Sequence, residues 1–219
     1  MTTAEAAARL DVSQRQVERL VGTGALATTR QVGRAWLIDA ASVARLAGRN
    51  RRKGRPWDSA TAWAGLWRLS ELAAPWLGSQ ASRRLDQRLA QISVGELAWV
   101  CRGRAQLTRF RASESFLVQL AGELRLTGAN VTQQARDLLS PATDRVDGYV
   151  TRNECDGIVR NYFLVEDTTG NVTLRVTDFP EVAAWVGTMP AAVVGIDLLD
   201  SAEPREAEAG RRLVEGLLP

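Results

Sequence analysis

Apolar residues near the start of the chain recur at the spacing of two short helices joined by the turn "DVS". The first helix is expected to begin near residue 3, because Thr2 and Glu5 form a capping box in which side chain and backbone bond reciprocally. Ser13 and Gln16 repeat this pattern, so the second helix is expected to begin at about Gln14. The side chains expected to face the core from this second helix are Val17, Leu20 and Val21, and the residue expected to end it is Gly22.

The stretch "LATTRQVGRAWLID" that follows predicts a hairpin. Short runs at residues 26–30 and 35–38 are expected to be strands, because the glycine-bearing turn "QVGR" separates them. Asp39 is then expected to cap a third helix at about residues 40–47. The predicted order is helix, turn, helix, hairpin, helix.

The hydrophobic pattern changes after residue 56. Four tryptophans, at positions 57, 63, 67 and 76, begin the next region, and Trp63, Leu66 and Trp67 keep a helical spacing. Tryptophans at this density favour packing between two domains over a stacking platform for nucleic acid or a partner surface. The pattern also predicts helices at residues 82–90, 94–101, 113–123 and 130–139, and extended segments at 106–112 and 124–128.

The last third of the chain predicts an α/β domain. Residues 171–178, "NVTLRVTD", alternate apolar and polar side chains as a half-buried strand does. The nearly continuous apolar run at 191–200 is predicted to be a buried central strand, and residues 201–219 an amphipathic closing helix. Further strands are expected at 147–152 and 161–167, and a short helix at 180–187.

Composition narrows the classes of function. The chain is 45% hydrophobic and 24% charged, as in ordinary globular proteins, and it shows neither a run of about 18 apolar residues nor a signal-peptide layout. We therefore expect a cytoplasmic protein with no membrane partner. The sequence has no histidine, which removes the usual general base, and Cys101 and Cys155 lack the spacing of a zinc site. We expect no catalytic residues, no metal and no cofactor.

Positive charge is concentrated at one end of the chain. Residues 1–56 hold 11 Lys and Arg against 4 Asp and Glu, whereas residues 57–219 hold 17 against 21. A basic terminal segment joined to a mildly acidic remainder is typical of a nucleic-acid-binding module with a different partner elsewhere. Within the basic segment, "GRNRRKGRP" at residues 48–56 predicts a linker whose side chains contact phosphates; the alternative is a solubilising hinge.

The stretches "TTAEAAARLDVSQRQVERLVGTGAL" and "VGRAWLIDAASVARL" resemble the winged helix-turn-helix of excisionase and MerR-like regulators. The resemblance implies that the second helix enters the major groove of double-stranded DNA while the hairpin, as a wing, contacts the backbone or minor groove. Arginine and glutamine side chains can form hydrogen bonds with the edges of bases. The alternative is that these arginines only solvate the surface of a small domain. The expected DNA-binding residues are Ser13, Gln14, Arg15, Gln16 and Arg19 in the helix, Arg30 and Arg34 in the hairpin, and Arg49, Arg51, Arg52 and Lys53 in the linker.

We thus predict an α+β protein: a winged helix-turn-helix at residues 1–48, a linker at 49–56, and an α/β domain with a helical N-terminal part at 57–219. The segments "LRLTGANV", "NVTLRVTD" and "VVGIDLLDSAEPREAEAGRRLVEGLL" resemble the C-terminal domain of AbiEi-type antitoxins of type IV toxin-antitoxin operons. That resemblance implies an autorepressor whose partner is a nucleotidyltransferase-like toxin. A second basic cluster is a candidate contact for such a partner, and the alternatives are a solvated strand face or a contact with nucleic acid. It consists of Arg102, Arg104, Arg109 and Arg111.

Three other functions are kept as alternatives. Self-association on DNA is a further expected interaction of the DNA-binding module. A phage-type excisionase or a plain transcription regulator would use the same DNA-binding module. A nucleic-acid enzyme is the alternative from another class, since the C-terminal region has several carboxylates that suit Mg²⁺. Their spacing gives no clear pair, and the chain's only lysine lies in the linker, so we expect that the protein is not an enzyme.

Overall fold

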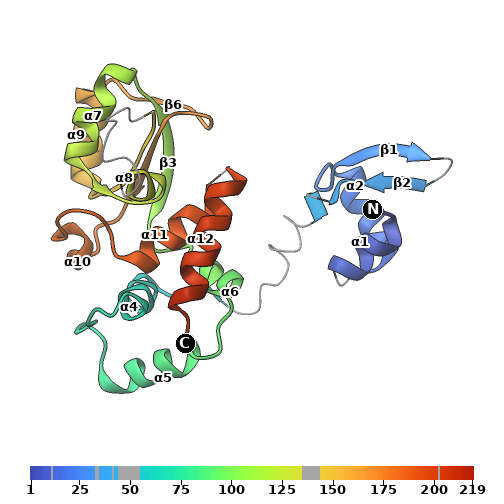
Figure 1. Ribbon diagram of the computed structural model, residues 1–219, viewed down its shortest axis with the longest axis horizontal. Coiled ribbons are helices and arrows are strands. Elements are labelled where there is room, and N and C mark those ends of the chain that lie inside the picture. The colour runs from blue at the N-terminus through green and yellow to red at the C-terminus, as the bar shows by residue number, and fades with distance from the viewer. Residues whose placement is uncertain (11, 33–34, 41, 44–54, 135–143, 202) are drawn as a thin grey trace. The chain divides into compact units, whose positions relative to one another are not determined.

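The computed structural model describes residues 1–219 except 11, 33–34, 41, 44–54, 135–143 and 202 (Figure 1). The chain divides into two compact units, Met1–Gly54 and Arg55–Pro219. Within the described residues, no helix is long and apolar enough to span a membrane.

The first unit contains two helices and a two-stranded antiparallel sheet. Helix α1 spans Thr3–Leu10 and α2 spans Gln14–Gly22, as the two capping boxes predict, and β1 (Thr28–Val32) pairs with β2 (Ala35–Ile38). Of the third helix predicted at 40–47, only residues 40, 42 and 43 are described, and they are helical. The small core of this unit consists of Ala6, Ala7, Leu10, Val17, Leu26, Ile38 and Val43.

Helix α2 ends at Gly22, as expected, but the left-handed residue of the turn that follows is Gly24 and not Gly22. Gly22 is the last helical residue, and Gly24 adopts the left-handed conformation, with φ +74°. The amide of Gly24 donates to the carbonyl of Val21 at 3.0 Å, and that of Thr23 donates to Arg19 at 2.9 Å. Glycine at position 24 carries no steric penalty for this conformation, so it closes α2 and turns the chain toward β1.

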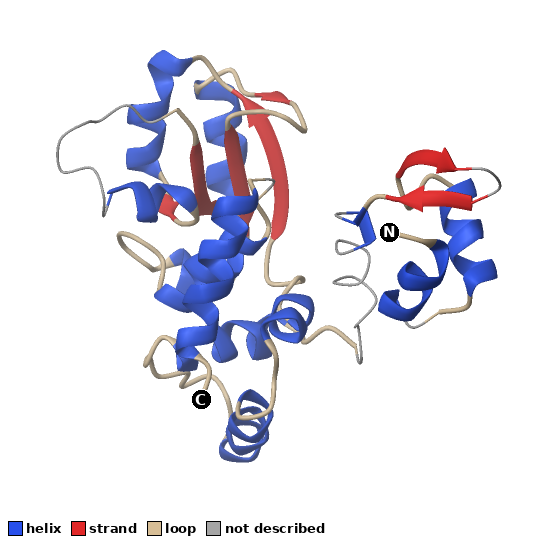
Figure 2. Ribbon diagram, turned by 45° about the vertical axis from the view of Figure 1, so that its right-hand side comes forward, coloured by secondary structure: helices blue, strands red, loops and turns tan. Residues whose placement is uncertain are grey.

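The second unit combines a five-stranded sheet with helices (Figure 2). The strand order is β4-β5-β7-β3-β6, in which β5 and β7 are parallel and the other neighbours antiparallel. The strands are β3 (Gln106–Arg111), β4 (Arg125–Leu126), β5 (Val146–Val150), β6 (Val165–Glu166) and β7 (Val172–Val176). The helices are α4 (Ser59–Leu69), α5 (Ser79–Leu89), α6 (Val94–Val100), α7 (Glu114–Glu123), α8 (Ala129–Gln134), α9 (Arg152–Asn161), α10 (Pro180–Ala183), α11 (Ala191–Leu199) and α12 (Pro204–Leu217).

Two hydrophobic clusters hold this unit together. In one, Leu117 and Leu120 of α7 and Ile158 of α9 pack with the apolar side chains of the strands, and both helices lie beside the sheet in Figure 1. The other is built around α4, α11 and α12 and contains Trp63 and Trp67. These two rings meet edge to face, with centroids 5.4 Å apart, so the expectation of packing between two domains is wrong: the tryptophans form the interior of one unit.

Three sequence-based expectations for this unit are corrected. The run at 191–200 is not a strand but helix α11, which is buried along most of its length and packs against α12. Residues 153–160, for which no element was expected, belong to α9, which begins behind a capping box between Thr151 and Glu154. Of the strand predicted at 161–167, only Val165 and Glu166 pair, at the edge of the sheet.

Candidate nucleic-acid interface and the charged core

Helix α2 presents a polar face with the residues expected to contact DNA. Ser13 is its N-cap, and its hydroxyl accepts a hydrogen bond of 3.2 Å from the backbone amide of Gln16. Val17 on the opposite side is fully buried. Because the buried side fixes the rotation of the helix, the polar side is directed to solvent: Ser13, Gln14, Arg15 and Arg19 are exposed, and Gln16 is half-buried.

The electrostatics of this face favour an anionic partner. Arg15 and Arg19 lie one helical turn apart, and neither forms an ion pair with any residue that the structure describes. The first turn of α2 holds no acidic residue, so no carboxylate there offsets the positive end of the helix dipole. Glu18 is the one acidic side chain of the helix. The arrangement can place two guanidinium groups and two amides against the edges of bases or against phosphates.

The remaining residues of the expected DNA interface are only partly described. Arg30 lies in β1, which continues toward the turn of the hairpin. Arg34 of the hairpin and Arg49, Arg51, Arg52 and Lys53 of the linker lie outside the described residues. The structure therefore brings together the helical part of the interface, and the contacts expected of the hairpin and linker stay predictions.

The second basic cluster, expected to meet a protein partner, is divided between different environments. Arg104 is buried, so it is unavailable to a partner, and the expectation is wrong for this residue. Arg102 is exposed and lies over the ring of Trp99, at 3.1 Å from the ring centroid. Arg111 is also exposed and donates to Asp167 at 2.6 Å. Arg109 is half-buried and donates to the backbone carbonyl of Asp200 at 3.3 Å.

Arg104 belongs instead to a buried ion network centred on Asp197. The carboxylate of Asp197, itself fully buried, accepts hydrogen bonds from Arg104, from the Tyr149 hydroxyl at 3.0 Å and from the Thr127 hydroxyl. Arg175 lies 3.0 Å from the same carboxylate. Because each buried charge has an opposite charge and a hydrogen-bond partner, the network can hold α11 against the sheet without the cost of an unpaired ion.

Arg175 extends this network toward solvent. Its guanidinium makes two parallel hydrogen bonds to Asp147, at 2.8 and 2.9 Å, and a third to Asp200 at 3.1 Å. Burial raises the pKa of the Asp147 carboxyl, and the positive charge of Arg175 opposes that rise. Burial alone would lower the pKa of Arg175, but the carboxylates of Asp197 and Asp147 raise it well above its ordinary value, so the guanidinium stays charged.

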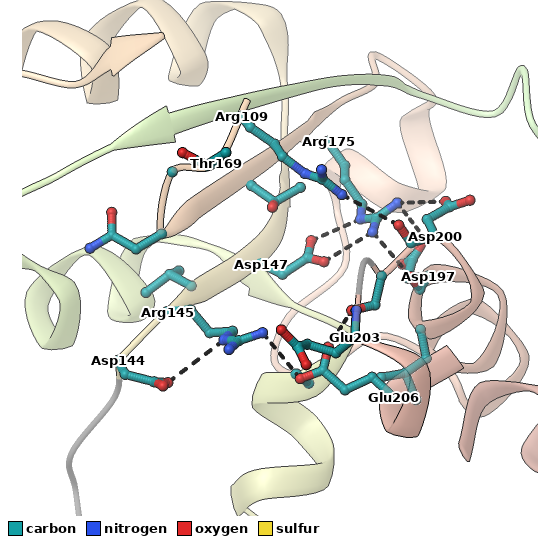
Figure 3. A pocket seen from close by; sticks show the side chains of 18 of the residues that line it. Arg109, Asp144, Arg145, Asp147, Thr169, Arg175, Asp197, Asp200, Glu203 and Glu206 are labelled. Carbon is teal, nitrogen blue, oxygen red and sulfur yellow. Dashed lines mark hydrogen bonds and ion pairs between the residues drawn. The ribbon is translucent and has the colours of Figure 1, made fainter. Parts of the chain in front are cut away.

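A pocket of about 390 Å³ opens over Asp147 and Arg175 (Figure 3). Arg145 lies on its other side and extends toward Asp144 and Glu206, with a distance of 3.2 Å between its guanidinium and the Glu206 carboxylate. The charged groups of the pocket are thus largely engaged with one another. Among the described residues, no group of three or more acidic or cysteine side chains is placed to hold a metal ion.

The sequence analysis treated these carboxylates only as candidate Mg²⁺ ligands and did not foresee the network. One signal was present, since Asp197 interrupts the apolar run "VVGIDLL". Arg175 gave none, because it stands with Thr173 and Thr177 on the polar side of the alternation in "NVTLRVTD". A charged residue inside an apolar element needs an opposite charge nearby, but the sequence does not say which of the many carboxylates or arginines supplies it.

The N-terminal unit also matches a known family. Residues 1–51 match the family model described as a helix-turn-helix domain. No curated protein and no solved structure matches the chain. An N-terminal helix-turn-helix domain indicates that the protein binds DNA, in a regulatory or excisionase-like role.

Proposed function

We propose that this protein is a transcription regulator that recognises a specific operator through helix α2. The observation that carries the proposal is the face formed by Gln14, Arg15 and Arg19, which is exposed, free of ion pairs among the described residues and anchored by the Ser13 cap. In a helix-turn-helix, the N-terminal part of the second helix contacts base edges. Arginine pairs with guanine and glutamine with adenine in the major groove, so these side chains can specify a sequence.

The antiparallel hairpin of β1 and β2 supports a second part of the proposal, that it acts as a wing. Arg30 of β1, together with Arg34, would then contact the phosphate backbone or minor groove beside α2. The linker arginines and Lys53 would add phosphate contacts that carry no sequence information. No catalytic step is part of this function.

The test is a selection from random double-stranded DNA with the full chain. The proposal expects enrichment of one motif, and loss of that motif when Arg15 and Arg19 are both replaced by alanine. An Arg205→Ala variant serves as the control, because Arg205 is an exposed arginine at the start of α12, in the other unit. Binding by the wild type without enrichment of any motif would contradict operator recognition.

A finer proposal concerns the second unit: that the regulator is the autorepressing antitoxin of an AbiE-like type IV operon. It is supported by the resemblance of the C-terminal segments to AbiEi-type antitoxins and by the change from a basic to a mildly acidic chain after residue 56. The exposed Arg102 and Arg111 are the members of the second basic cluster that can meet an acidic partner surface.

Co-expression of the full chain with the product of the neighbouring gene tests this finer proposal. If that gene encodes a nucleotidyltransferase-like toxin, the antitoxin proposal expects rescue of growth by the wild type and by the variant lacking Arg15 and Arg19. The same variant should no longer repress the operon. Failure of the wild type to rescue would reject the antitoxin role and leave a plain regulator, whereas a neighbouring integrase would favour a recombination accessory factor.

A further inference from the structure

Helix α5 of the second unit has a strongly basic outer face. Leu85 and Leu89 are buried against the helical core of the unit, and this fixes which side of the helix is turned outward. At 100° per residue, the side opposite these leucines carries Gln80, Arg83, Arg84 and Gln87, and Arg88 lies at the flank of this face. All five side chains are exposed.

The positive charge of this face is poorly offset by its neighbours. Asp86, the only acidic residue of α5, pairs with Arg68 of α4 at 3.2 Å. Arg88 reaches Glu96 of α6 only at 4.0 Å. Arg83 and Arg84 form no ion pair with any residue that the structure describes. This excess of positive charge is confined to α5 and its surroundings, because residues 57–219 as a whole hold more acidic than basic side chains.

The arginines of α12 show the contrasting arrangement. Arg211 pairs with both Glu208 and Glu215, at 2.7 and 2.5 Å, and Arg212 pairs with Glu208 at 2.9 Å. These hydrogen bonds lower the pKa of the Glu208 carboxyl to about 2, so the helix neutralises its own arginines at neutral pH. Arg83 and Arg84 of α5 have no such acidic partners among the described residues. Their positive charge therefore remains available to bind another molecule.

We propose that the outer face of α5 is a second DNA contact, which binds phosphates beside the site that α2 recognises. The inference rests on the proposed function and extends it from one unit to both. Three guanidinium groups within two turns match a polyanion that carries one negative charge per about 1.7 Å of duplex. Because both units belong to one chain, binding of the first raises the effective concentration of DNA at the second.

The contact supplies affinity rather than sequence choice. Arginines that meet only phosphates strengthen binding to all sequences alike and fix the register of the protein on the duplex. The face therefore accounts for how a small helix-turn-helix module, which alone gathers few contacts, holds its operator at physiological salt.

The experiment compares two variants of the full chain that lose the same charge, R83Q/R84Q in α5 and R211Q/R212Q in α12. All four arginines are exposed and helical, and glutamine is nearly as good a helix former, so both variants are expected to fold. Binding to the selected operator and to unrelated duplex is measured from low to high salt. R83Q/R84Q is expected to reduce the slope of log affinity against log salt by about 1.8 for both DNAs. R211Q/R212Q is expected to leave it unchanged.

Equal slopes for the two variants, with both chains folded by circular dichroism, would overturn the inference. In that case an acidic protein surface would become the partner of this face. The proposed function is judged separately in the same experiment: if Arg15→Ala still weakens operator binding selectively, α2 remains the recognition helix although the α5 contact has failed. If the wild type shows no preference for any operator, the proposed function fails, while the slope comparison on unrelated duplex still decides the α5 contact.

Discussion

Arg104 and Asp197, which are 93 residues apart in the sequence, form a buried ion pair between the turn before β3 and helix α11. The side chains are 4% and 0% exposed. Neither can be solvated by water, so each depends on the other and on Tyr149 for compensation. The pair therefore joins the helical core of the second unit to its sheet.

We predict that Asp197→Ala destabilises the protein by about 3–5 kcal/mol, because the buried guanidinium of Arg104 loses its buried counter-charge and keeps only that of the exposed Asp200, at 3.4 Å. The control is Asp86→Ala, which removes the exposed partner of Arg68 and should cost only about 0–1 kcal/mol. Urea unfolding followed by tryptophan fluorescence measures both. Similar losses of unfolding free energy in the two variants would show that the buried ion pair stabilises the protein no more than a surface ion pair does.

Gly210 of α12 packs against Gly195 of α11 so closely that no side chain fits between them. A Cβ at position 210 would lie 2.6 Å from the backbone oxygen of Gly195 and 2.6 Å from the Cβ of Leu198. Gly210→Ala is predicted to cost about 1–3 kcal/mol through displacement of the helices. Gly216→Ala in the same helix meets nothing within 4 Å and should stabilise by about 0.5–1 kcal/mol. Thermal unfolding of the two variants should thus shift in opposite directions, and shifts of the same sign would refute the account of this contact.

Ser13 is expected to stabilise the recognition helix locally. Its hydroxyl caps α2 by accepting from the Gln16 amide, and Ser13→Ala should cost about 1 kcal/mol. Ser113→Ala is a suitable control, because Ser113 precedes α7 without a side-chain capping bond. Amide hydrogen exchange reports each helix separately. Faster exchange in α2 for the first variant and unchanged exchange in α7 for the second are predicted; no change in α2 would exclude a capping role.

Glu154 makes the second unit sensitive to acid. Burial alone would raise the pKa of its carboxyl, but hydrogen bonds from Arg125 and from the Thr151 amide lower it below the ordinary 4.5. A lowered pKa in the folded state means that ionised Glu154 stabilises the fold above pH 4.5, and that this stabilisation disappears as the pH falls through the folded value. The difference in unfolding free energy between wild type and Glu154→Gln should be constant near pH 7 and shrink below about pH 4.5. A difference that persists unchanged at pH 3 would contradict the assignment.

The local signals in the sequence predicted most of the first unit. Ser13 and Gln16 marked the start of α2, and the spacing of Val17, Leu20 and Val21 gave its buried side, because a short amphipathic helix with a cap shows its orientation in its own residues. The polar face of the candidate site followed directly from that orientation. The antiparallel pairing of β1 with β2 agrees with the hairpin that the sequence predicts.

The second unit was less predictable because its elements depend on distant neighbours. Helix α11 is buried nearly all round, so it shows no alternation of apolar and polar sides and was mistaken for a central strand. The sheet order, with β7 between β5 and β3, depends on contacts that no local pattern records. The partners of Arg104 and Arg175 are likewise set by the tertiary fold. Helix α9 had a local signal that was missed, the Thr-x-x-Glu capping box at Thr151.

The most direct test of the account is the effect of Arg15→Ala on binding to the selected operator and to unrelated duplex of the same length. If Arg15 contacts a base, the change should weaken operator binding by about 1–3 kcal/mol, or roughly 5- to 150-fold, and affect unrelated DNA much less. Arg9→Ala, at an exposed position of α1, is the matched control and should not alter the ratio of the two affinities. An equal loss on both DNAs for Arg15→Ala would mean that α2 contacts only phosphates and would contradict the claim that this helix reads the operator.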